Sequence, residues 1–595
     1  MSDFTPPLAD INFTLATVAG LDRLAALPGL EDATPDLVGQ VLEEAGKFAG
    51  QILAPLNTVG DREGSRLENG VVRTPTGFGD AYRAFAEGGW MGLPFASEWG
   101  GQSLPWAVAT ATQELWTAAN LSFSLCGLLT QGAIEALVAH GTDAQKALYL
   151  PRLVSGQWSG TMNLTEPQAG SDVGALRTRA VAEGDHYRIT GQKIFITYGE
   201  QDLTENIIHL VLARTPDAPA GTKGISLFIV PKFLVRPDGT LGDRNDLRCL
   251  SLEEKLGIHA SPTCVMSYGE NGGAIGYRVG EERRGMEYMF TMMNNARLGV
   301  GVQGLGIAER AWQQARAYAH VRIQGRDATD RDPAPVPIVR HPDVRRMLLT
   351  MRATVEGIRA LIYFTAAAID RAHHAPDARE REREQTMAEL LTPVAKAWST
   401  DRGALVASLG VQVHGGIGFI ESAGAAQHYR DARIAPIYEG TNGIQAADLV
   451  GRKLLRDNGE AMRQLVGQIG ETLAADAGEA NGNALRGALQ EAIRELEAAT
   501  KFLLAGAKTD LRTVLAGATP YLDLVGTVVA GWLLLVEARA AAQALASGKG
   551  DAAFMKQKLG VARFFAENLL PQARSLAIAA VRGAEAVTAF EAEQI

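Results

Sequence analysis

The sequence contains few cysteines and no excess of basic residues. Its 595 residues include only three cysteines, Cys126, Cys249 and Cys264. These are far apart and odd in number, which fits neither a disulfide framework nor a zinc site. The formal net charge of -10 is unfavourable for contact with nucleic acid or anionic lipid. We therefore expect a reducing compartment, no metal site, and a small molecule or another protein as the partner.

The sequence also lacks a long hydrophobic run and a recognisable targeting segment. The strongest candidate for a membrane span is the apolar stretch 524–536, which is shorter than the roughly 20 residues that a spanning helix needs. We predict that it forms a buried core helix. The first residues, MSDFTPPLADINF, contain neither the basic region of a secretory signal nor the arginine-rich pattern of a transit peptide. These features predict a soluble, cytoplasmic protein without a membrane span.

The sequence does contain enough apolar residues for several cores. It is 46% hydrophobic and 21% charged, as globular proteins are, and it is too long for a single core. Its apolar residues first follow a helical period, then alternate, and then return to the helical period. We predict an α+β multidomain fold with five regions: an N-terminal extension (1–34), a helical N-terminal domain (35–160), an antiparallel β domain (161–283), a helical bundle (284–460) and a C-terminal helical domain (461–595).

Two segments near the β domain carry residues suited to ligand binding. LTEPQAGSDVGA, at 164–175, is a glycine-flanked turn whose N–H groups and serine hydroxyl can bind a phosphate or a flavin edge. KIFITYGE, at 193–200, alternates as a strand does and places Phe195 and Thr197 on one face, which suits stacking against a planar ring. Taken singly, the first segment is equally well a polar turn and the second a core strand.

A third segment lies in the predicted helical bundle. QVHGGIGF, at 412–419, contains paired glycines that permit close approach of a ligand or another backbone. It leads into YRDARIAPIYEGTNGIQ, where Glu439 lies between Tyr438 and Gly440 just before a predicted helix. An acid at such a position is often a helix cap or a partner of the helix dipole. Its position alone therefore leaves a structural and a chemical role open.

In this order and spacing, the three segments resemble the acyl-CoA dehydrogenase family, together with HGTDAQKALYLPRLVSGQWSG before them. The resemblance runs from roughly Gln40 to Arg456. The start LADINFTL, the segment TMNLTEPQAGSDVG and the long C-terminal extension are similar to the large bacterial branch that includes methylmercaptopropionyl-CoA dehydrogenases. The resemblance implies a helical domain, a β domain and a four-helix domain that enclose FAD and an acyl-CoA.

The family pattern assigns roles to individual residues of this sequence. It implies that the first segment contacts the isoalloxazine ring and the pyrophosphate, and that the strand flanks the flavin. It also implies that Arg322 and the diglycine segment reach the FAD of a neighbouring subunit, so a homodimer is the minimum assembly. The implied catalytic base is Glu439, the FAD contacts are Met162, Leu164, Thr165, Ser171, Phe195, Thr197, Arg322, Gln412, Gly416 and Thr441, and the substrate contacts are Ser171, Asn294, Arg297 and Gly440.

The sequence departs from the family pattern at several of these contacts. Met162 stands where many relatives have an aromatic residue, and Phe195 stands where they have tryptophan. IQGR follows Arg322 in place of KTFG, Gly443 replaces a glutamine, and Asn294 replaces an aspartate. We expect stacking against the flavin to survive these changes, and the adenosine and CoA contacts stay open.

The activity that the resemblance implies is α,β-dehydrogenation of an acyl-CoA thioester to the trans-2-enoyl-CoA, as in fatty acid β-oxidation. Glu439 would remove the Cα proton, flavin N5 would accept the Cβ hydride, and electron-transferring flavoprotein would receive the electrons. Burial in an apolar pocket should raise the pKa of Glu439, and its backbone N–H should help to polarise the thioester oxygen. Arg297 either orients this carboxylate or forms a structural salt bridge.

Other functions are compatible with parts of this pattern. An acyl-CoA oxidase performs the same half-reaction with O2 as the acceptor. A DNA-binding damage-response protein on the same fold is disfavoured by the acidic net charge and by the presence of Glu439. A membrane-associated dehydrogenase is disfavoured because the C-terminal region has no basic amphipathic face. The sequence leaves open the acyl chain length and branching, dimer versus tetramer, the electron acceptor and the role of the C-terminal domain.

Overall fold

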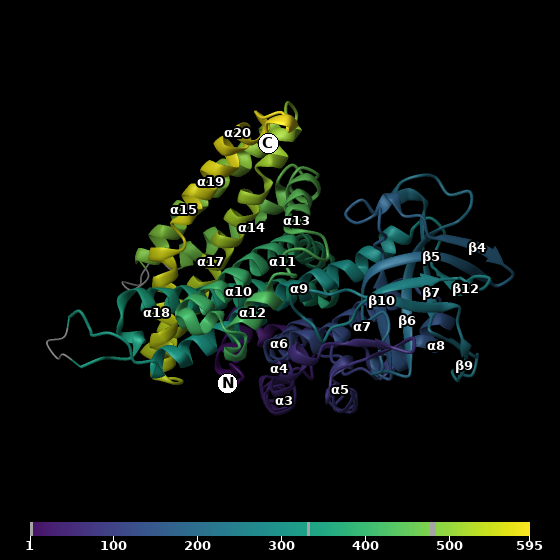
Figure 1. The fold of residues 1–595 in the computed structure, drawn as a ribbon. Helices are drawn as coiled ribbons and strands as arrows, with labels where there is room; N and C mark the ends of the chain where they lie inside the picture. Colours follow the sequence, from purple (N-terminus) through teal and green to yellow (C-terminus); the bar gives the residue numbers. More distant parts are fainter. Residues whose placement is uncertain (1–3, 330–333, 476–482) are drawn as a thin grey trace. The chain divides into compact units, whose positions relative to one another are not determined.

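The computed structural model describes residues 4–329, 334–475 and 483–595 (Figure 1). The chain forms two compact units. We call the first the helical unit, which consists of Met1–Gly46, Pro105–Ala118 and Val300–Ile595. The second, the β unit, consists of Lys47–Leu104 and Ala119–Gly299. Each unit combines segments from several of the five regions predicted from the sequence, whose boundaries stay predictions.

The β unit is built on one eight-stranded sheet. Its strands are β3 (Trp158–Asn163), β4 (Arg179–Glu183), β5 (His186–Thr197), β6 (Asn206–Arg214), β7 (Ile225–Pro231), β10 (Leu247–Leu252), β11 (Thr263–Tyr268) and β12 (Ala274–Val279). Their order is β10-β11-β5-β12-β7-β6-β3, and β4 pairs with β5 and β6. β7 reads as a continuous apolar run because all of its residues are buried.

The strand pairs are mostly antiparallel, as the alternating pattern predicts, but β3 pairs with β6 in parallel. This pair joins segments on either side of the β4–β5 hairpin, so local alternation gives no sign of it. The helix α7 covers β3, and a Cβ atom at Gly160 of β3 would lie 2.4 Å from the Cβ of Ala133 in that helix. The remaining elements of this unit are α4 (Ala54–Glu63), β1 (Arg66–Glu68), β2 (Val71–Arg73), α5 (Phe78–Glu87), α7 (Leu121–His140), α8 (Asp143–Val154), β8 (Phe233–Val235) and β9 (Leu241–Arg244).

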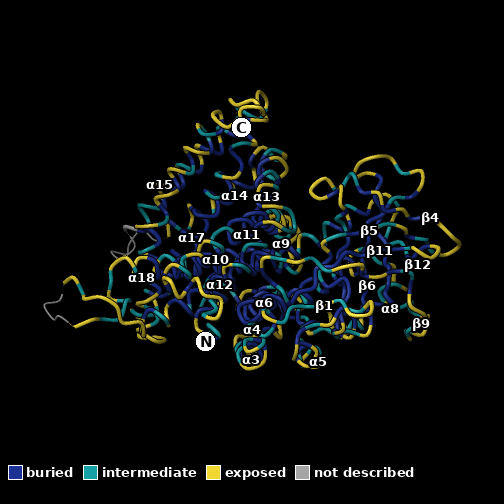
Figure 2. Tube along the Cα trace, viewed as in Figure 1, coloured by how far each residue is buried: buried dark blue, intermediate teal, exposed yellow. Residues whose placement is uncertain are grey.

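The helical unit contains long helices around a core formed by α10 and α11, which Figure 2 shows as largely buried. A Cβ atom at Gly304 would lie 2.5 Å from the carbonyl oxygen of Ser399, so the backbones of α9 and α11 approach closely. The helices are α1 (Leu8–Thr14), α2 (Leu21–Leu24), α3 (Pro35–Phe48), α6 (Trp106–Ala119), α9 (Gly285–Val321, which begins in the β unit), α10 (Pro342–His374), α11 (Ala378–His414), α12 (Ala425–Ala432), α13 (Asn442–Asp448), α14 (Glu460–Ala475), α15 (Asn483–Gly506), α16 (Leu511–Ala516), α17 (Ala518–Ala546), α18 (Ala552–Asn568), α19 (Gln572–Ile578) and α20 (Ala584–Thr588).

The C-terminal helices pack directly on this core. The ring of Trp398 on α11 is seated on Gly526 of α17, where a Cβ atom would lie 2.4 Å from the Trp398 ring. The buried ammonium of Lys558 on α18 lies 3.0 Å from Asp10, 3.2 Å from Glu356 and 3.2 Å from Glu537. Because these carboxylates belong to α1, α10 and α17, one lysine links the N-terminal extension, the core and the C-terminal region.

Among the described residues, two helices are long and apolar enough to cross a membrane by length and composition, α7 and α17. In each, 78% of the most apolar 18-residue window is buried inside the structure. The stretch 524–536 lies in α17, and nearly all of its residues are buried. The prediction of a buried core helix at this stretch is therefore confirmed.

Candidate active site

Glu439 lies in the turn between α12 and α13, and it is half-buried. Its backbone φ is 57°, in the left-handed region that non-glycine residues seldom occupy. Such a conformation costs about 1–3 kcal/mol and persists only where neighbouring groups hold it. Gly440 follows at φ 79°, and a Cβ atom there would lie 2.8 Å from the Nε2 atom of Gln445. This turn therefore needs glycine at position 440 and external support at position 439.

Two fully buried side chains supply that support. The Gln445 amide donates hydrogen bonds to the carbonyl oxygens of Glu439 (3.1 Å) and Gly440 (3.2 Å). The Lys396 ammonium, on α11, donates to the carbonyl oxygen of Gly440 (2.9 Å) and to Oδ1 of Asn442 (2.8 Å). Hydrogen bonds from a charged donor are the stronger kind. Together these bonds fix the backbone of the turn and the direction in which the Glu439 side chain leaves it.

The helix that follows is capped by a different residue. Thr441 is the N-cap of α13, and its hydroxyl accepts a hydrogen bond from the N–H of Ile444 at 3.3 Å. The hydroxyl of Tyr438 donates to Gln303 on α9. Burial, reinforced by the nearby Glu439 carboxylate, raises the pKa of Tyr438, so this phenol is neutral. Thr441, and not Glu439, is therefore the residue that caps the N-terminus of α13.

In the β unit, the sequence-predicted flavin strand contains a β-bulge. The register between β5 and β11 shifts, so that Ile194 and Phe195 together face the single residue Val265. Phe195 has a φ of 59° and is 58% exposed. A large aromatic side chain exposed in this way on a strand can stack on a flat ligand. Thr197, at the end of the same strand, is half-buried.

The bulged strand and the segment after β3 are joined by a buried ion pair. Glu166 accepts hydrogen bonds from the Lys193 ammonium at 2.8 Å and from the Thr178 hydroxyl at 2.6 Å. Lys193 also donates to the carbonyl oxygen of Leu164 at 2.9 Å. The carbonyl oxygen of Thr165 accepts from the N–H of Ile194 at 2.9 Å. Leu164 and Thr165 are thereby held beside Phe195.

Both pKa values of this ion pair are lowered, for different reasons. Burial alone would raise the pKa of Glu166, but the Lys193 ammonium and several hydrogen bonds outweigh it and lower the pKa to about 2. Burial lowers the pKa of Lys193 to about 8, although Glu166 acts in the other direction. The Lys193 ammonium nitrogen lies 2.8 Å from a carboxylate oxygen of Glu166. Because both pKa values leave these groups ionised at neutral pH, the pair is charged.

The other predicted residues of the β unit occupy varied positions. Met162 is buried within β3, and Ser171 is exposed in the loop that follows this strand. Asn294 is exposed on α9, whereas Arg297, one turn further, is buried with its guanidinium 6.0 Å from the centre of the Phe290 ring. The segment after β3 and the bulged strand β5 are joined by hydrogen bonds. They carry four of the predicted contacts in this unit: Leu164, Thr165, Phe195 and Thr197.

In the helical unit, the predicted diphosphate contacts are all exposed. Arg322 follows the end of α9, Gln412 lies in the last turn of α11, and Gly416 lies in the turn 415–419 that continues from it. A Cβ atom at Gly416 would meet nothing within 4 Å. Beside it, Phe419 is 84% exposed, and other large apolar side chains of this region are also exposed: Val321, Ile323, Ile417 and Ile420.

Comparison with known proteins identifies the family. Four family models match consecutive parts of the chain: acyl-CoA dehydrogenase N-terminal domain (40–157), middle domain (161–269), C-terminal domain (283–455) and acetyl-CoA dehydrogenase C-terminal like (465–591). The chain is 50% identical over 573 residues to 3-methylmercaptopropionyl-CoA dehydrogenase from Ruegeria pomeroyi, covering 95% of this chain and 96% of that protein. The chain belongs to the acyl-CoA dehydrogenase family.

Two further relatives place it within the family. It is 36% identical over 592 residues to the broad-specificity linear acyl-CoA dehydrogenase FadE5 of Mycobacterium tuberculosis, covering 96% of both chains. A crystal structure of an acyl-CoA dehydrogenase from Bacillus anthracis, complexed with FAD, shares the fold with a TM-score of 0.74, at 20% identity and over 96% of this chain and 91% of that one. The extra C-terminal helical domain is thus part of the fold, and the chain is an FAD-dependent oxidoreductase of this class.

The residues present suit the flavin of the family. Phe195 offers an exposed aromatic face. The half-buried Thr197 lies two residues further along the strand, and the half-buried Thr165 is hydrogen-bonded to Ile194, next to Phe195. An isoalloxazine ring can stack on Phe195 while its polar edge forms hydrogen bonds with the hydroxyl groups of Thr165 and Thr197. The open space around Gly416 similarly permits close approach of a phosphate-bearing ligand to the backbone.

The residues that hold the site were not predicted from the sequence. Lys396, Gln445, Glu166 and Lys193 position the predicted residues but are distant from them in the chain or look like ordinary surface residues. The one available signal was the position of Lys396 in LTPVAKAWST, an otherwise apolar stretch of a helix. A lone lysine there must find a buried partner.

Proposed function

We propose that this acyl-CoA dehydrogenase oxidises the Cα–Cβ bond of an acyl-CoA thioester to the trans-2-enoyl-CoA, with Glu439 as the base that removes the Cα proton. The observation that supports this role is the left-handed backbone of Glu439, held by Gln445 and Lys396. Backbone strain that the surroundings actively maintain is typical of catalytic positions. The helix α13 is capped by Thr441, whose hydroxyl accepts a hydrogen bond from the N–H of Ile444, so Glu439 does not act as the cap.

The turn itself offers more than the carboxylate. We propose that the backbone N–H of Glu439 donates to the thioester oxygen, so that negative charge developing on this oxygen is stabilised while the proton leaves Cα. Gly440 and Thr441 would line the same edge of the site. Because Lys396 and Gln445 hold the carbonyl groups of residues 439 and 440, the N–H and the carboxylate of Glu439 would be oriented together.

The β unit carries the residues that we propose for the cofactor. We propose that Met162, Leu164, Thr165, Ser171, Phe195 and Thr197 hold FAD, which when bound supplies a hydride acceptor for Cβ. Phe195 would cover the ring and the Thr165 hydroxyl would bond to its edge. Asn294 and Arg297 would face the substrate, with Arg297 in a positioning role. The ion pair of Glu166 and Lys193 would keep the first segment at a fixed distance from the bulge.

The test of the base is Glu439→Gln, which keeps the size of the side chain and removes its basicity. We expect a folded protein with normal FAD content and a loss of turnover of about 100-fold or more, since removing a general base costs this much. Glu421→Gln is a matched control, because Glu421 is an exposed acid in the same region whose partner is Arg430. Normal turnover of the Glu439 variant would eliminate the assignment.

We further propose that electron-transferring flavoprotein receives the electrons and that the enzyme is a homodimer or a higher oligomer in which Arg322, Gln412 and Gly416 contact the FAD of the neighbouring subunit. The exposed apolar side chains beside Gly416 support such an assembly. The oxidase alternative predicts rapid reoxidation of the reduced flavin in air without electron-transferring flavoprotein. Stopped-flow reoxidation with and without that protein separates the two possibilities.

For the substrate, we propose a short acyl-CoA, including thioether acyl groups, because the relative at 50% identity is a 3-methylmercaptopropionyl-CoA dehydrogenase. The rate of flavin bleaching with 3-methylmercaptopropionyl-CoA, butyryl-CoA and a long-chain acyl-CoA tests this. Faster bleaching with the long-chain substrate than with either short one would contradict the proposal.

A further inference from the structure

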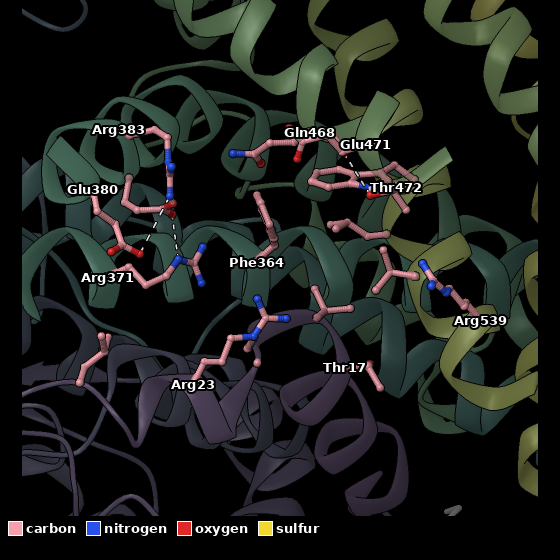
Figure 3. Close-up of a pocket in the computed structure, with 18 residues that line it drawn as sticks. Thr17, Arg23, Phe364, Arg371, Glu380, Arg383, Gln468, Glu471, Thr472 and Arg539 are labelled. Atoms are coloured by element: carbon pink, nitrogen blue, oxygen red, sulfur yellow. Dashed lines mark hydrogen bonds and ion pairs between the residues drawn. The ribbon is translucent and has the colours of Figure 1, made fainter. Parts of the chain in front are cut away.

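A cavity of about 460 Å³ lies within the helical unit, and none of the predicted site residues lines it (Figure 3). Its walls come from the N-terminal extension between Thr17 and Leu27, from α10 and α11, and from α14 and α17 of the C-terminal region. Two of these three wall segments lie outside the core family models of residues 40–455. The cavity is therefore formed where the N-terminal extension and the C-terminal region meet the core helices α10 and α11.

The lining carries more positive than negative charge. Four arginines and three glutamates line the cavity: Arg23, Arg371, Arg383, Arg539, Glu380, Glu384 and Glu471. The buried Glu384 carboxylate lies between two of the guanidinium groups, accepting from Arg371 at 2.8 Å and from Arg383 at 3.2 Å. One carboxylate thus serves two arginines, and the charges of the lining leave an excess of one positive charge.

The other two arginines are available to a ligand. Within the described part of the chain, neither Arg23 nor Arg539 has a carboxylate within ion-pair distance. Arg539 is half-buried in α17, so its charge is only partly hydrated. Figure 3 shows Arg371 and Arg539 on opposite sides of Phe364. A guanidinium group binds a carboxylate through two parallel hydrogen bonds, so Arg539 alone can hold one carboxylate.

The remaining wall is apolar and aromatic. The rings of Phe364 and Trp532 are 5.1 Å apart at an angle of 73°, and Leu27, Leu533 and Val536 complete this side. The indole N–H of Trp532 donates to the Thr472 hydroxyl at 2.9 Å, so the ring is fixed and its polar edge is already satisfied. An apolar ligand body can lie on these side chains without leaving a buried donor unpaired.

We infer that this cavity binds a monocarboxylate with an apolar chain, with its carboxylate at Arg539 and its chain on Phe364 and Trp532. One excess positive charge matches one carboxylate better than a doubly charged phosphate. The volume is in the range of small-molecule sites. The inference does not depend on the role of Glu439, because no residue of the catalytic turn lines the cavity.

The test is calorimetric titration of the FAD-loaded enzyme with octanoate, octanol and inorganic phosphate. Arg539→Gln should weaken octanoate binding about 10-fold or more, the usual effect of losing a charge-assisted hydrogen bond. Arg539→Lys should weaken it less, because the charge is kept. Arg574→Gln is the matched control, since Arg574 is exposed on α19 and does not line the cavity; its octanoate affinity should equal that of the wild type.

Each other outcome overturns the inference. Equal octanoate binding by the wild type and Arg539→Gln would place the ligand elsewhere, for example in the acyl-CoA site. No heat of binding at the solubility limit of octanoate would remove the site altogether. Tighter binding of phosphate than of octanoate, with the same dependence on Arg539, would replace the amphipathic ligand with a simple anion. Thermal unfolding of each variant shows that the comparison is made between folded proteins.

Discussion

Lys396 is the residue whose removal gives the sharpest test of how the turn that carries Glu439 is held. Lys396→Met keeps a long apolar stem in α11 but removes the ammonium that bonds to Gly440 and Asn442. Each hydrogen bond from a charged donor contributes about 1.5–3 kcal/mol. The two remaining amide bonds from Gln445 contribute about 0.5–1.5 kcal/mol each, against a cost of about 1–3 kcal/mol for the left-handed backbone of Glu439.

Loss of the bond from the Lys396 ammonium to the Gly440 carbonyl removes about 1.5–3 kcal/mol of support. This shifts the equilibrium of the turn toward other conformations about 10- to 100-fold. We expect kcat to fall by a factor in this range, with little change in KM and a normal FAD content, because the ammonium does not contact the predicted cofactor residues. Steady-state turnover and single-turnover flavin reduction both measure this.

Two further variants make the outcome decisive. Lys453→Met removes a half-buried lysine whose partner is Glu389, so it controls for loss of a lysine near α11 without a change at the turn. Gln445→Met removes the bonds to Glu439 and Gly440 while leaving Lys396 in place, and it should also lower kcat. If Lys396→Met is folded, FAD-loaded and has a wild-type kcat, then the turn does not depend on this ammonium and the reasoning fails.

Three other outcomes follow from the structure. Because the folded pKa of Glu166 is lowered to about 2, its stabilising contribution is present above its unfolded pKa and is lost as the pH falls toward 2. The difference in urea midpoint between wild type and Glu166→Gln should therefore shrink between pH 5 and pH 3, and a constant difference would contradict this. Lys558→Met leaves Asp10, Glu356 and Glu537 without their shared cation, so the free energy of unfolding should fall by about 3–5 kcal/mol. Lys556→Met, at an exposed neighbouring lysine, should leave the free energy of unfolding unchanged, and equal denaturant midpoints for the two variants would show that the network adds no stability. Phe419→Ser should convert the proposed dimer to monomer and release FAD in light-scattering and absorbance measurements, whereas Phe590→Ser, at an exposed phenylalanine near the C-terminus, should do neither; an unchanged mass would move the interface elsewhere.

The sequence predicts the order of helical and β segments well, because periodicity is a local property. The buried helix at 524–536 and the acyl-CoA dehydrogenase fold followed from apolar runs and from motifs in a fixed order. The parallel pairing of β3 with β6 did not. Both strands are almost wholly buried, and nothing within either strand specifies which neighbour it joins or in which direction.

The supporting residues escaped prediction for a related reason. Lys193 and Lys558 resemble ordinary surface lysines in the sequence, since the acids that neutralise them lie 27 and up to several hundred residues away. The left-handed φ of Glu439 and Phe195 is equally hidden, because neither residue type favours it and only the surrounding hydrogen bonds or a bulge impose it. Motifs locate the predicted site residues, whereas nonlocal contacts decide how they are held.

The helix α11 carries two anchor points two residues apart, and this spacing has a consequence for the whole protein. Lys396 bonds to the carbonyl oxygen of Gly440 in the turn that carries Glu439, and the Trp398 ring packs on Gly526 of α17. Residues at i and i+2 point to different sides of a helix. Helix α11 is therefore held on one side by the turn that carries Glu439 and on the other by α17. A protein truncated before α17 would lose the contact between Gly526 and Trp398 and would expose the indole to water. Helix α11 could then shift relative to the turn that carries Glu439.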